Sequence, residues 1–159
     1  MKRCLVCFLF VVTCLLVGCT DMHMEEGMSE KPVIDVPVYD WGITLTTENI
    51  SAKGLTLVCT QSGGEAQGEL QTGSWYEIQK NENGTWKKVE YTEIEEELVG
   101  WTGEAWCIPK DSTVKWEVEW SWLYDELPAG KYRIGKEIMD FMETGRYDET
   151  VIYAEFTIQ

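Results

Sequence analysis

The sequence predicts an all-β domain that folds as an antiparallel β-sandwich of about seven to eight strands. From Tyr39 onward hydrophobic and polar residues alternate, and stretches that contain Gly, Asn and Pro separate the alternating segments. A period of two is typical of strands that bury one face, and many short strands joined by such turns favour a sandwich. After residue 20 no segment shows a sustained helical stripe, and only residues 136–143 are ambiguous between helix and strand.

The clearest alternating segment runs from Val114 to Trp122, with a hydrophobic residue at every second position. Trp116, Trp120 and Trp122 share this apolar face, so we expect all three in the core. The same pattern places further residues on apolar faces: Trp41, Ile43 and Leu45, then Leu55, Leu57 and Cys59, and near the C-terminus Ile152, Ala154, Phe156 and Ile158.

A β-hairpin is predicted around Asn83 and Gly84, because Asn-Gly is the strongest short hairpin turn. The length of the turn leaves two registers open. A two-residue turn places Ile78 opposite Val89, whereas a four-residue loop places Tyr76 opposite Val89.

Both registers give each residue of the hairpin the same face. The residues expected on the inner face are Tyr76, Ile78, Val89 and Tyr91. Trp75 and Trp86 therefore fall on the polar face. There they are either exposed as a binding platform or covered by a loop or another sheet.

Residues 127–133 (LPAGKYR) combine a turn containing Pro and Gly with a strand that opens at Tyr132. A tyrosine at this place, with its hydroxyl reaching back to the turn backbone, forms a tyrosine corner. Residues 39–159 resemble the bacterial immunoglobulin-like domain family in the stretches YDWGITLTTENISAKGLTLVCTQSGG, GELQTGSWYEIQ, LPAGKYRIGKEIMDF and YAEFTI. The resemblance implies an immunoglobulin-like β-sandwich and brings neither catalytic residues nor an established ligand.

The first twenty residues predict where the protein is located. Two basic residues, Lys2 and Arg3, precede an apolar run over residues 4–17. This run is shorter than the ~20 residues of a membrane-spanning helix and has the length of a signal-peptide core. Residues 16–19 (LVGC) resemble the lipobox of bacterial lipoproteins. The resemblance implies that Cys19 carries a diacylglycerol and that cleavage occurs before it.

The chain thus divides into a lipoprotein signal peptide (1–18), a lipidated cysteine with a flexible acidic tether (19–38) and an immunoglobulin-like domain (39–159). The tether is rich in Met and acidic residues and has no apolar period, which is typical of a flexible segment. We therefore expect an extracytoplasmic protein that is anchored to the cell membrane through the lipid on Cys19.

The charge of the chain excludes one class of partner. Loss of residues 1–18 removes two of the 13 basic residues and none of the 28 acidic ones, so the formal charge changes from −15 to −17. A surface this acidic repels nucleic acid and anionic lipid headgroups. We expect no binding of DNA or RNA.

Few residues are suited to catalysis or to metal binding. Cys59 and Cys107 are the cysteines that remain beside the anchor, and the sequence leaves open whether they form a disulfide or stay free. The single histidine, His23, lies in the tether, so the domain holds no histidine base. The acidic run 92–97 has the character of a solvated loop and lacks the spacing of a calcium loop. We expect no enzyme, no cofactor and no metal site.

The sequence therefore predicts a membrane-anchored lipoprotein that displays a non-catalytic binding or sensing module. Its partner is either an unknown protein or a cell-wall glycan. The alternative is a carbohydrate-binding module that uses exposed Trp75 and Trp86.

Overall fold

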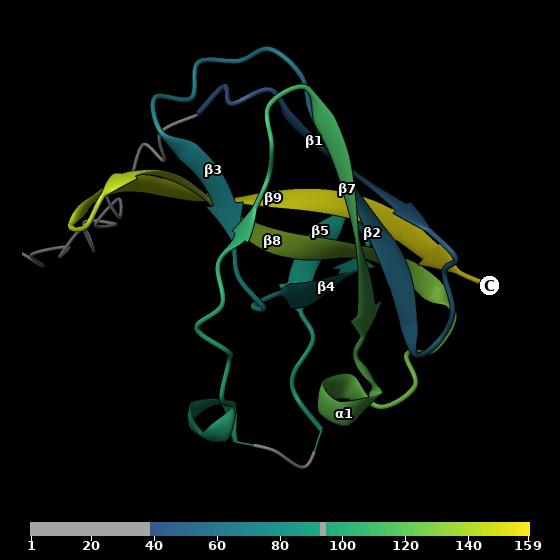
Figure 1. The fold of residues 1–159 in the computed structure, drawn as a ribbon. Helices are drawn as coiled ribbons and strands as arrows, with labels where there is room; N and C mark the ends of the chain where they lie inside the picture. The colour runs from purple at the N-terminus through teal and green to yellow at the C-terminus, as the bar shows by residue number, and fades with distance from the viewer. Residues whose placement is uncertain (1–38, 93–94) are drawn as a thin grey trace, which may run out of the picture. The chain divides into compact units, whose positions relative to one another are not determined.

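The structure of the chain is a computed structural model that describes residues 39–92 and 95–159. Within these residues it contains nine β-strands, a short α-helix and a 3-10 helix (Figure 1). The elements are β1 (Ile43–Glu48), β2 (Gly54–Gln61), β3 (Glu69–Thr72), β4 (Glu77–Glu82), β5 (Thr85–Lys88), η1 (Glu96–Leu98), β6 (Trp106–Cys107), β7 (Ser112–Glu119), α1 (Ser121–Tyr124), β8 (Gly130–Glu143) and β9 (Arg146–Ile158). Neither of these two helices has the length and apolar character needed to cross a membrane.

The strands form two antiparallel sheets, which confirms the predicted β-sandwich. The smaller sheet has the order β1-β2-β7, and the larger sheet is organised around the long strand β8. One edge of β8 pairs with β9, while the other edge pairs first with β4 and then with β3. Strands β5 and β6 extend the larger sheet beyond β4 and β3. Figure 1 shows the strands of the smaller sheet running across those of the larger one.

The core lies between the two sheets and contains the side chains that the alternating pattern places there. Trp120 is fully buried, donates its indole N–H to the Ala52 carbonyl at 2.9 Å and packs against Phe156. Trp116 is half-buried and packs against the edge of the core. The other fully or largely buried apolar residues of the predicted faces are Trp41, Leu45, Leu55, Leu57, Cys59, Ala154, Phe156 and Ile158.

The hairpin between β4 and β5 has the two-residue turn. Asn81 pairs with Trp86, and the Val89 N–H donates to the Ile78 carbonyl at 2.9 Å. The four-residue register is therefore wrong. Asn83 and Gly84 both have positive φ, which is the backbone conformation that an Asn-Gly hairpin turn uses. The inner face is confirmed as well, because Tyr76 and Ile78 are buried while Val89 and Tyr91 pack against the core.

The predicted tyrosine corner is present. Tyr132 is buried, and its hydroxyl donates to the Pro128 carbonyl at 2.9 Å. The ambiguous residues 136–143 belong to β8. Two of its inward positions hold buried polar residues, Lys136 and Asp140, and these interrupt the apolar pattern of the strand.

The expectation that Trp122 lies in the core is wrong. Strand β7 ends at Glu119 and α1 begins at Ser121, so the period of two no longer applies at Trp122. The Trp122 side chain is 47% exposed, and its indole N–H donates to the Glu119 carbonyl at 3.1 Å.

We predict that Trp120→Ala lowers the free energy of unfolding by about 3–5 kcal/mol, because it leaves a large cavity and removes the indole hydrogen bond to the Ala52 carbonyl. Trp116→Ala should cost clearly less, since its ring is already half-exposed. Urea unfolding of the two variants, followed by circular dichroism, measures the difference. Equal losses for both variants would contradict the burial described here.

Candidate binding site

The two flanks of the sandwich are closed in different ways. On one flank β1 lies beside β9, and the Tyr39 hydroxyl donates to Asp148 Oδ1 at 3.1 Å. On the other flank β7 is the edge of the smaller sheet and β6 is the edge of the larger one. Trp106 of β6 and Trp116 of β7 stack there with ring centroids 6.3 Å apart and planes at 25°. Aromatic contact therefore joins the two edges of this flank.

A second pair of tryptophans lies where β7 is followed by α1. Trp101 precedes β6 and meets Trp122 of α1 edge to face, with centroids 5.8 Å apart. The Tyr76 ring lies against Trp101 at 5.3 Å. The Tyr76 hydroxyl and the Trp122 indole N–H both donate to the Glu119 carbonyl, each at 3.1 Å. The end of β7 thus fixes the position of this second pair.

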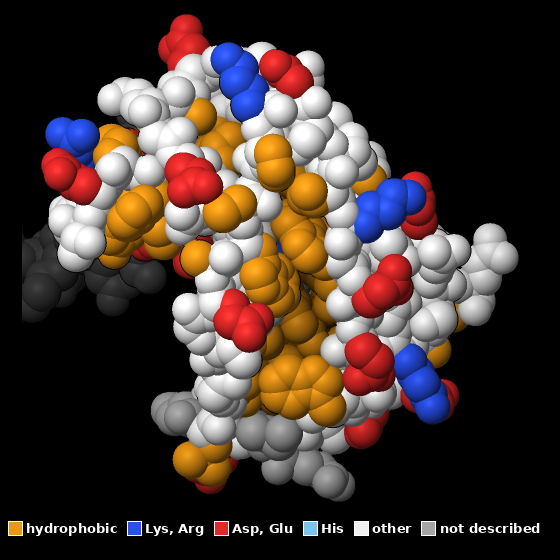
Figure 2. Space-filling view, in the orientation of Figure 1, with side chains coloured by type: hydrophobic (Ala, Val, Ile, Leu, Met, Phe, Trp, Pro, Cys, Tyr) orange, Lys and Arg blue, Asp and Glu red, His pale blue; other side chains and the backbone are white. Residues whose placement is uncertain are grey.

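We call the four residues Trp101, Trp106, Trp116 and Trp122 the aromatic hollow. Figure 2 shows hydrophobic side chains gathered in a hollow that runs alongside β7. Three of the rings are half-buried, and Trp122 is 47% exposed. Open apolar surface of this kind marks interaction sites, and tryptophan is enriched among the residues that contribute most to binding.

The edge of the aromatic hollow carries acidic groups. Glu104 accepts the Trp106 indole N–H at 3.2 Å, and Glu119 ends the strand beside Trp122. A ligand here would meet aromatic rings in the centre and carboxylates at the margin.

A buried ammonium group supports the aromatic hollow from inside. Lys136 is 2% exposed, and its Nζ lies 5.0 Å from the centroid of Trp106 and 5.9 Å from that of Trp116. Nζ donates to the Trp75 carbonyl at 2.9 Å and also to the Gly73 carbonyl. Burial lowers the pKa of Lys136 to about 8, because removal from water disfavours the charged form.

The sequence predicts Trp75 and Trp86 as candidate binding residues, and the structure places them apart. Trp86 lies opposite Asn81 near the hairpin turn, whereas Trp75 precedes the first residue of β4. Six residues of extended chain separate Trp75 from Asn81, a span of roughly 20 Å. The two indoles therefore do not form one platform. The backbone carbonyl of Trp75 accepts a hydrogen bond from Lys136.

The Trp86 ring is half-buried because cationic side chains of β8 lie over it. The Arg133 guanidinium carbon is 4.8 Å from the Trp86 centroid and 4.0 Å from the Tyr153 centroid. Lys131 Nζ lies 5.5 Å from the same Trp86 ring. Gln79 Oε1 accepts two hydrogen bonds from Arg133, at 2.9 and 2.6 Å. These cation–π contacts cover the Trp86 ring on the outer side of the larger sheet.

The two cysteines of the domain are both free. Cys59 of β2 is buried in the core, and burial raises its pKa to about 11. Cys107 of β6 belongs to the other sheet and is exposed. A hydrogen bond to Glu69 raises the pKa of Cys107 above its ordinary value, so its thiol is poorly suited to act as a nucleophile.

The remaining candidate residues form no metal site within the described part of the chain. In residues 39–92 and 95–159 no three His, Cys, Asp or Glu side chains come together in a way that could hold a metal ion. Part of the acidic run 92–97 lies outside the described residues, as do Cys19 and His23.

The alternating pattern does not indicate Trp101 and Trp106 as site residues, because neither belongs to an alternating segment. A signal was nevertheless present: five of the eight tryptophans lie between residues 101 and 122. Five tryptophans within 22 residues are more than one strand can bury on a single face.

Two antiparallel sheets, a tyrosine corner and loops at both ends define an immunoglobulin-like sandwich. Residues 39–157 match the family model of the bacterial Ig-like domain. The match covers well over half of the chain, and the chain belongs to the bacterial Ig-like domain family. No curated protein and no solved structure matches it.

We predict a pH effect on stability that originates from Lys136. Its folded pKa of about 8 lies below its unfolded value, so between pH 8 and about 10 the unfolded chain binds the extra proton and stability rises with pH. From pH 7 to pH 9 the gain should be about 1 kcal/mol. The control is Lys136→Met, which keeps the opposing effect of Cys59, whose raised pKa lowers stability above pH 9. Urea unfolding at several pH values should show the gain in the unmodified protein alone, and identical slopes would contradict the assignment.

Proposed function

We propose that this chain is a membrane-anchored extracytoplasmic lipoprotein whose Ig-like domain is a non-catalytic binding module. The observation that carries the proposal is the aromatic hollow at the open flank of the sandwich. The ligand is an extracytoplasmic protein segment or a cell-wall glycan that covers the rings of Trp101 and Trp122.

Two features of the domain support binding rather than catalysis. The exposed thiol of Cys107 has a pKa raised by its hydrogen bond to Glu69, which makes it a poor nucleophile. The aromatic rings, in contrast, are fixed in place by hydrogen bonds and by each other. Rigid aromatic groups lose little side-chain freedom when a ligand binds, so they favour affinity.

A carbohydrate-binding module that uses Trp75 and Trp86 has less support. Arg133 and Lys131 lie over the Trp86 ring, and Trp75 is too distant to act with it. A sugar would find larger open rings in the aromatic hollow.

The anchor is tested by Cys19→Ala. In the producing bacterium we expect the unmodified protein in the membrane fraction, because two acyl chains hold a protein there. The Cys19→Ala variant should accumulate as the unprocessed precursor or in a released form, detected by immunoblotting of cell fractions. A variant that is processed normally and stays in the membrane would contradict the lipoprotein assignment.

The binding surface is tested by site-specific photo-crosslinking in living cells. We expect that replacing Trp122 by p-benzoylphenylalanine yields discrete crosslinked products, because a bound ligand would lie against this position. The control position is Tyr147, which has the same 47% exposure and belongs to β9. Sensitivity of the products to a protease or to a muramidase tells a protein ligand from a wall glycan. Equal crosslinking at both positions, or none at position 122, would contradict the aromatic hollow as the binding surface.

A further inference from the structure

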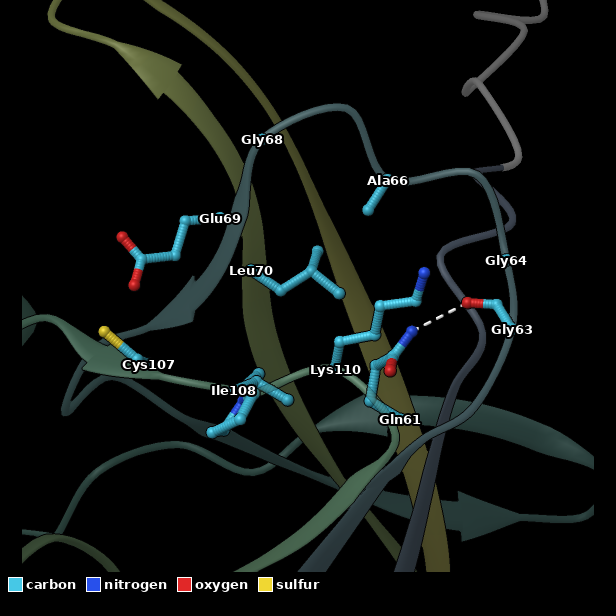
Figure 3. Close-up of a pocket in the computed structure, with 11 residues that line it drawn as sticks. Gln61, Gly63, Gly64, Ala66, Gly68, Glu69, Leu70, Cys107, Ile108 and Lys110 are labelled. Carbon is cyan, nitrogen blue, oxygen red and sulfur yellow. Dashed lines mark hydrogen bonds between the residues drawn. The ribbon is translucent and has the colours of Figure 1, made fainter.

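A second concave site lies at one end of the sandwich, away from the rings of the aromatic hollow. A cavity of about 430 Å³ opens between the β2–β3 loop and the segment that joins β6 to β7 (Figure 3). Sites for small ligands in proteins span roughly 300–1,000 Å³, so this cavity can enclose a small molecule.

The walls of the cavity are fixed by two buried polar side chains. Gln61 is 3% exposed and donates to the Gly63 carbonyl at 2.7 Å, while its Oε1 accepts the Asp111 N–H at 2.6 Å. Asp140 accepts the N–H groups of Gln67 and Gly68, both at 2.7 Å. Gln61 thus holds the loops on both sides of the cavity. A site whose walls are already ordered loses less entropy when a ligand binds.

The side of the cavity formed by the β2–β3 loop consists largely of main chain. Gly64 has a φ of +78°, and a Cβ there would come within 2.2 Å of the Gly42 nitrogen. Glycine is therefore required for the loop to lie against residues 41 and 42.

The floor of the cavity is aliphatic and its two sides carry opposite charges. Leu70 and Ile108 are buried at 5% and 3% exposure. In Figure 3 Leu70 and Ile108 lie between Glu69 with Cys107 on one side and Lys110 on the other, and the Lys110 side chain extends toward Ala66. Glu69 accepts hydrogen bonds from Gln71 and from the Cys107 thiol, neither of which is a cation.

Lys110 differs from every other cation in the described residues. Six lysine and arginine side chains form ion pairs with carboxylates. The others lie over aromatic rings, namely Lys80 over Tyr132, Arg133 over Trp86 and Tyr153, and Lys136 over Trp106 and Trp116. Within residues 39–92 and 95–159, Lys110 alone has neither a carboxylate within 4 Å nor an aromatic ring. In so acidic a domain, its ammonium is therefore available to a carboxylate from a ligand.

We propose that this cavity binds a short zwitterionic peptide with an aliphatic side chain. The peptide carboxylate lies at Lys110, its ammonium lies at Glu69, and its aliphatic side chain rests on Leu70 and Ile108. A free amino acid is too short, because both of its charges sit on one carbon and two aliphatic side chains separate Lys110 from Glu69. Each added residue extends a peptide by about 3.3–3.6 Å. A peptide of two or three residues can therefore place its carboxylate at Lys110 and its ammonium at Glu69.

The experiment uses the dipeptide alanyl-leucine and the full-length protein purified in detergent, with binding measured by calorimetric titration. We expect saturable binding that is weakened about five-fold by N-acetylation and about five-fold by C-terminal amidation, as for partly exposed ion pairs. In Glu69→Gln the acetylated and free peptides should bind alike. In Lys110→Met the amidated and free peptides should bind alike.

The matched controls are Glu65→Gln in the β2–β3 loop, four residues before Glu69, and Lys115→Met on β7, both of which should retain the full preference for the zwitterion. All four substitutions are at exposed positions, so unchanged melting temperatures are expected and are checked first. Absence of saturable binding by alanyl-leucine overturns the proposal. The proposal is also overturned if N-acetylation still weakens binding to Glu69→Gln and C-terminal amidation still weakens binding to Lys110→Met. These outcomes are independent of crosslinking at position 122, so this proposal and the proposed function fail separately.

Discussion

The open flank of the sandwich depends on one ammonium group that has almost no contact with water. Lys136 Nζ donates to the carbonyls of Gly73 and Trp75 and lies beneath the rings of Trp106 and Trp116. A buried charge is tolerated only where hydrogen-bond acceptors compensate the loss of hydration. Because these acceptors lie in the connection between β3 and β4, the ammonium fixes that connection against β8.

The consequences of this contact reach both ends of the aromatic hollow. Thr72 of β3 pairs with Trp106 of β6, so the strand that ends just before Gly73 also positions one stacked ring. On the other side of the connection, Tyr76 follows Trp75 directly, and its ring supports Trp101. One buried lysine therefore sets the relative positions of the two tryptophan pairs. A methionine of similar length would fill the space but would leave both carbonyls without a donor.

The sequence predicts those parts of the structure that depend on near neighbours in the chain. The faces of the β4–β5 hairpin follow from Asn83-Gly84 and a period of two, and the tyrosine corner follows from residues 127–133. The core position of Trp120 follows from the same period. These features are local, so a single segment contains enough information to specify them.

The aromatic hollow could not be predicted in this way, because it forms where distant segments meet. Strand β6 has two residues, too few to show a period, and its stacking partner Trp116 lies on the other sheet. The pattern wrongly predicts a core position for Trp122, because it gives no sign that the strand changes into a helix at Ser121. Residues 136–143 of β8 are ambiguous in the sequence because Lys136 is buried. In a hydrophobic pattern a buried cation cannot be told from a surface residue.

The same short segment forms part of both proposed sites. In β6, Trp106 is half-buried and stacks in the aromatic hollow, whereas Cys107 is exposed and lines the cavity. This division follows from the strand geometry, in which successive side chains point to opposite faces. Ile108, whose N–H donates to the Leu70 carbonyl at 2.8 Å, then attaches the segment to β3. Two residues of one strand thus suffice to separate a large aromatic surface from a small charged cavity.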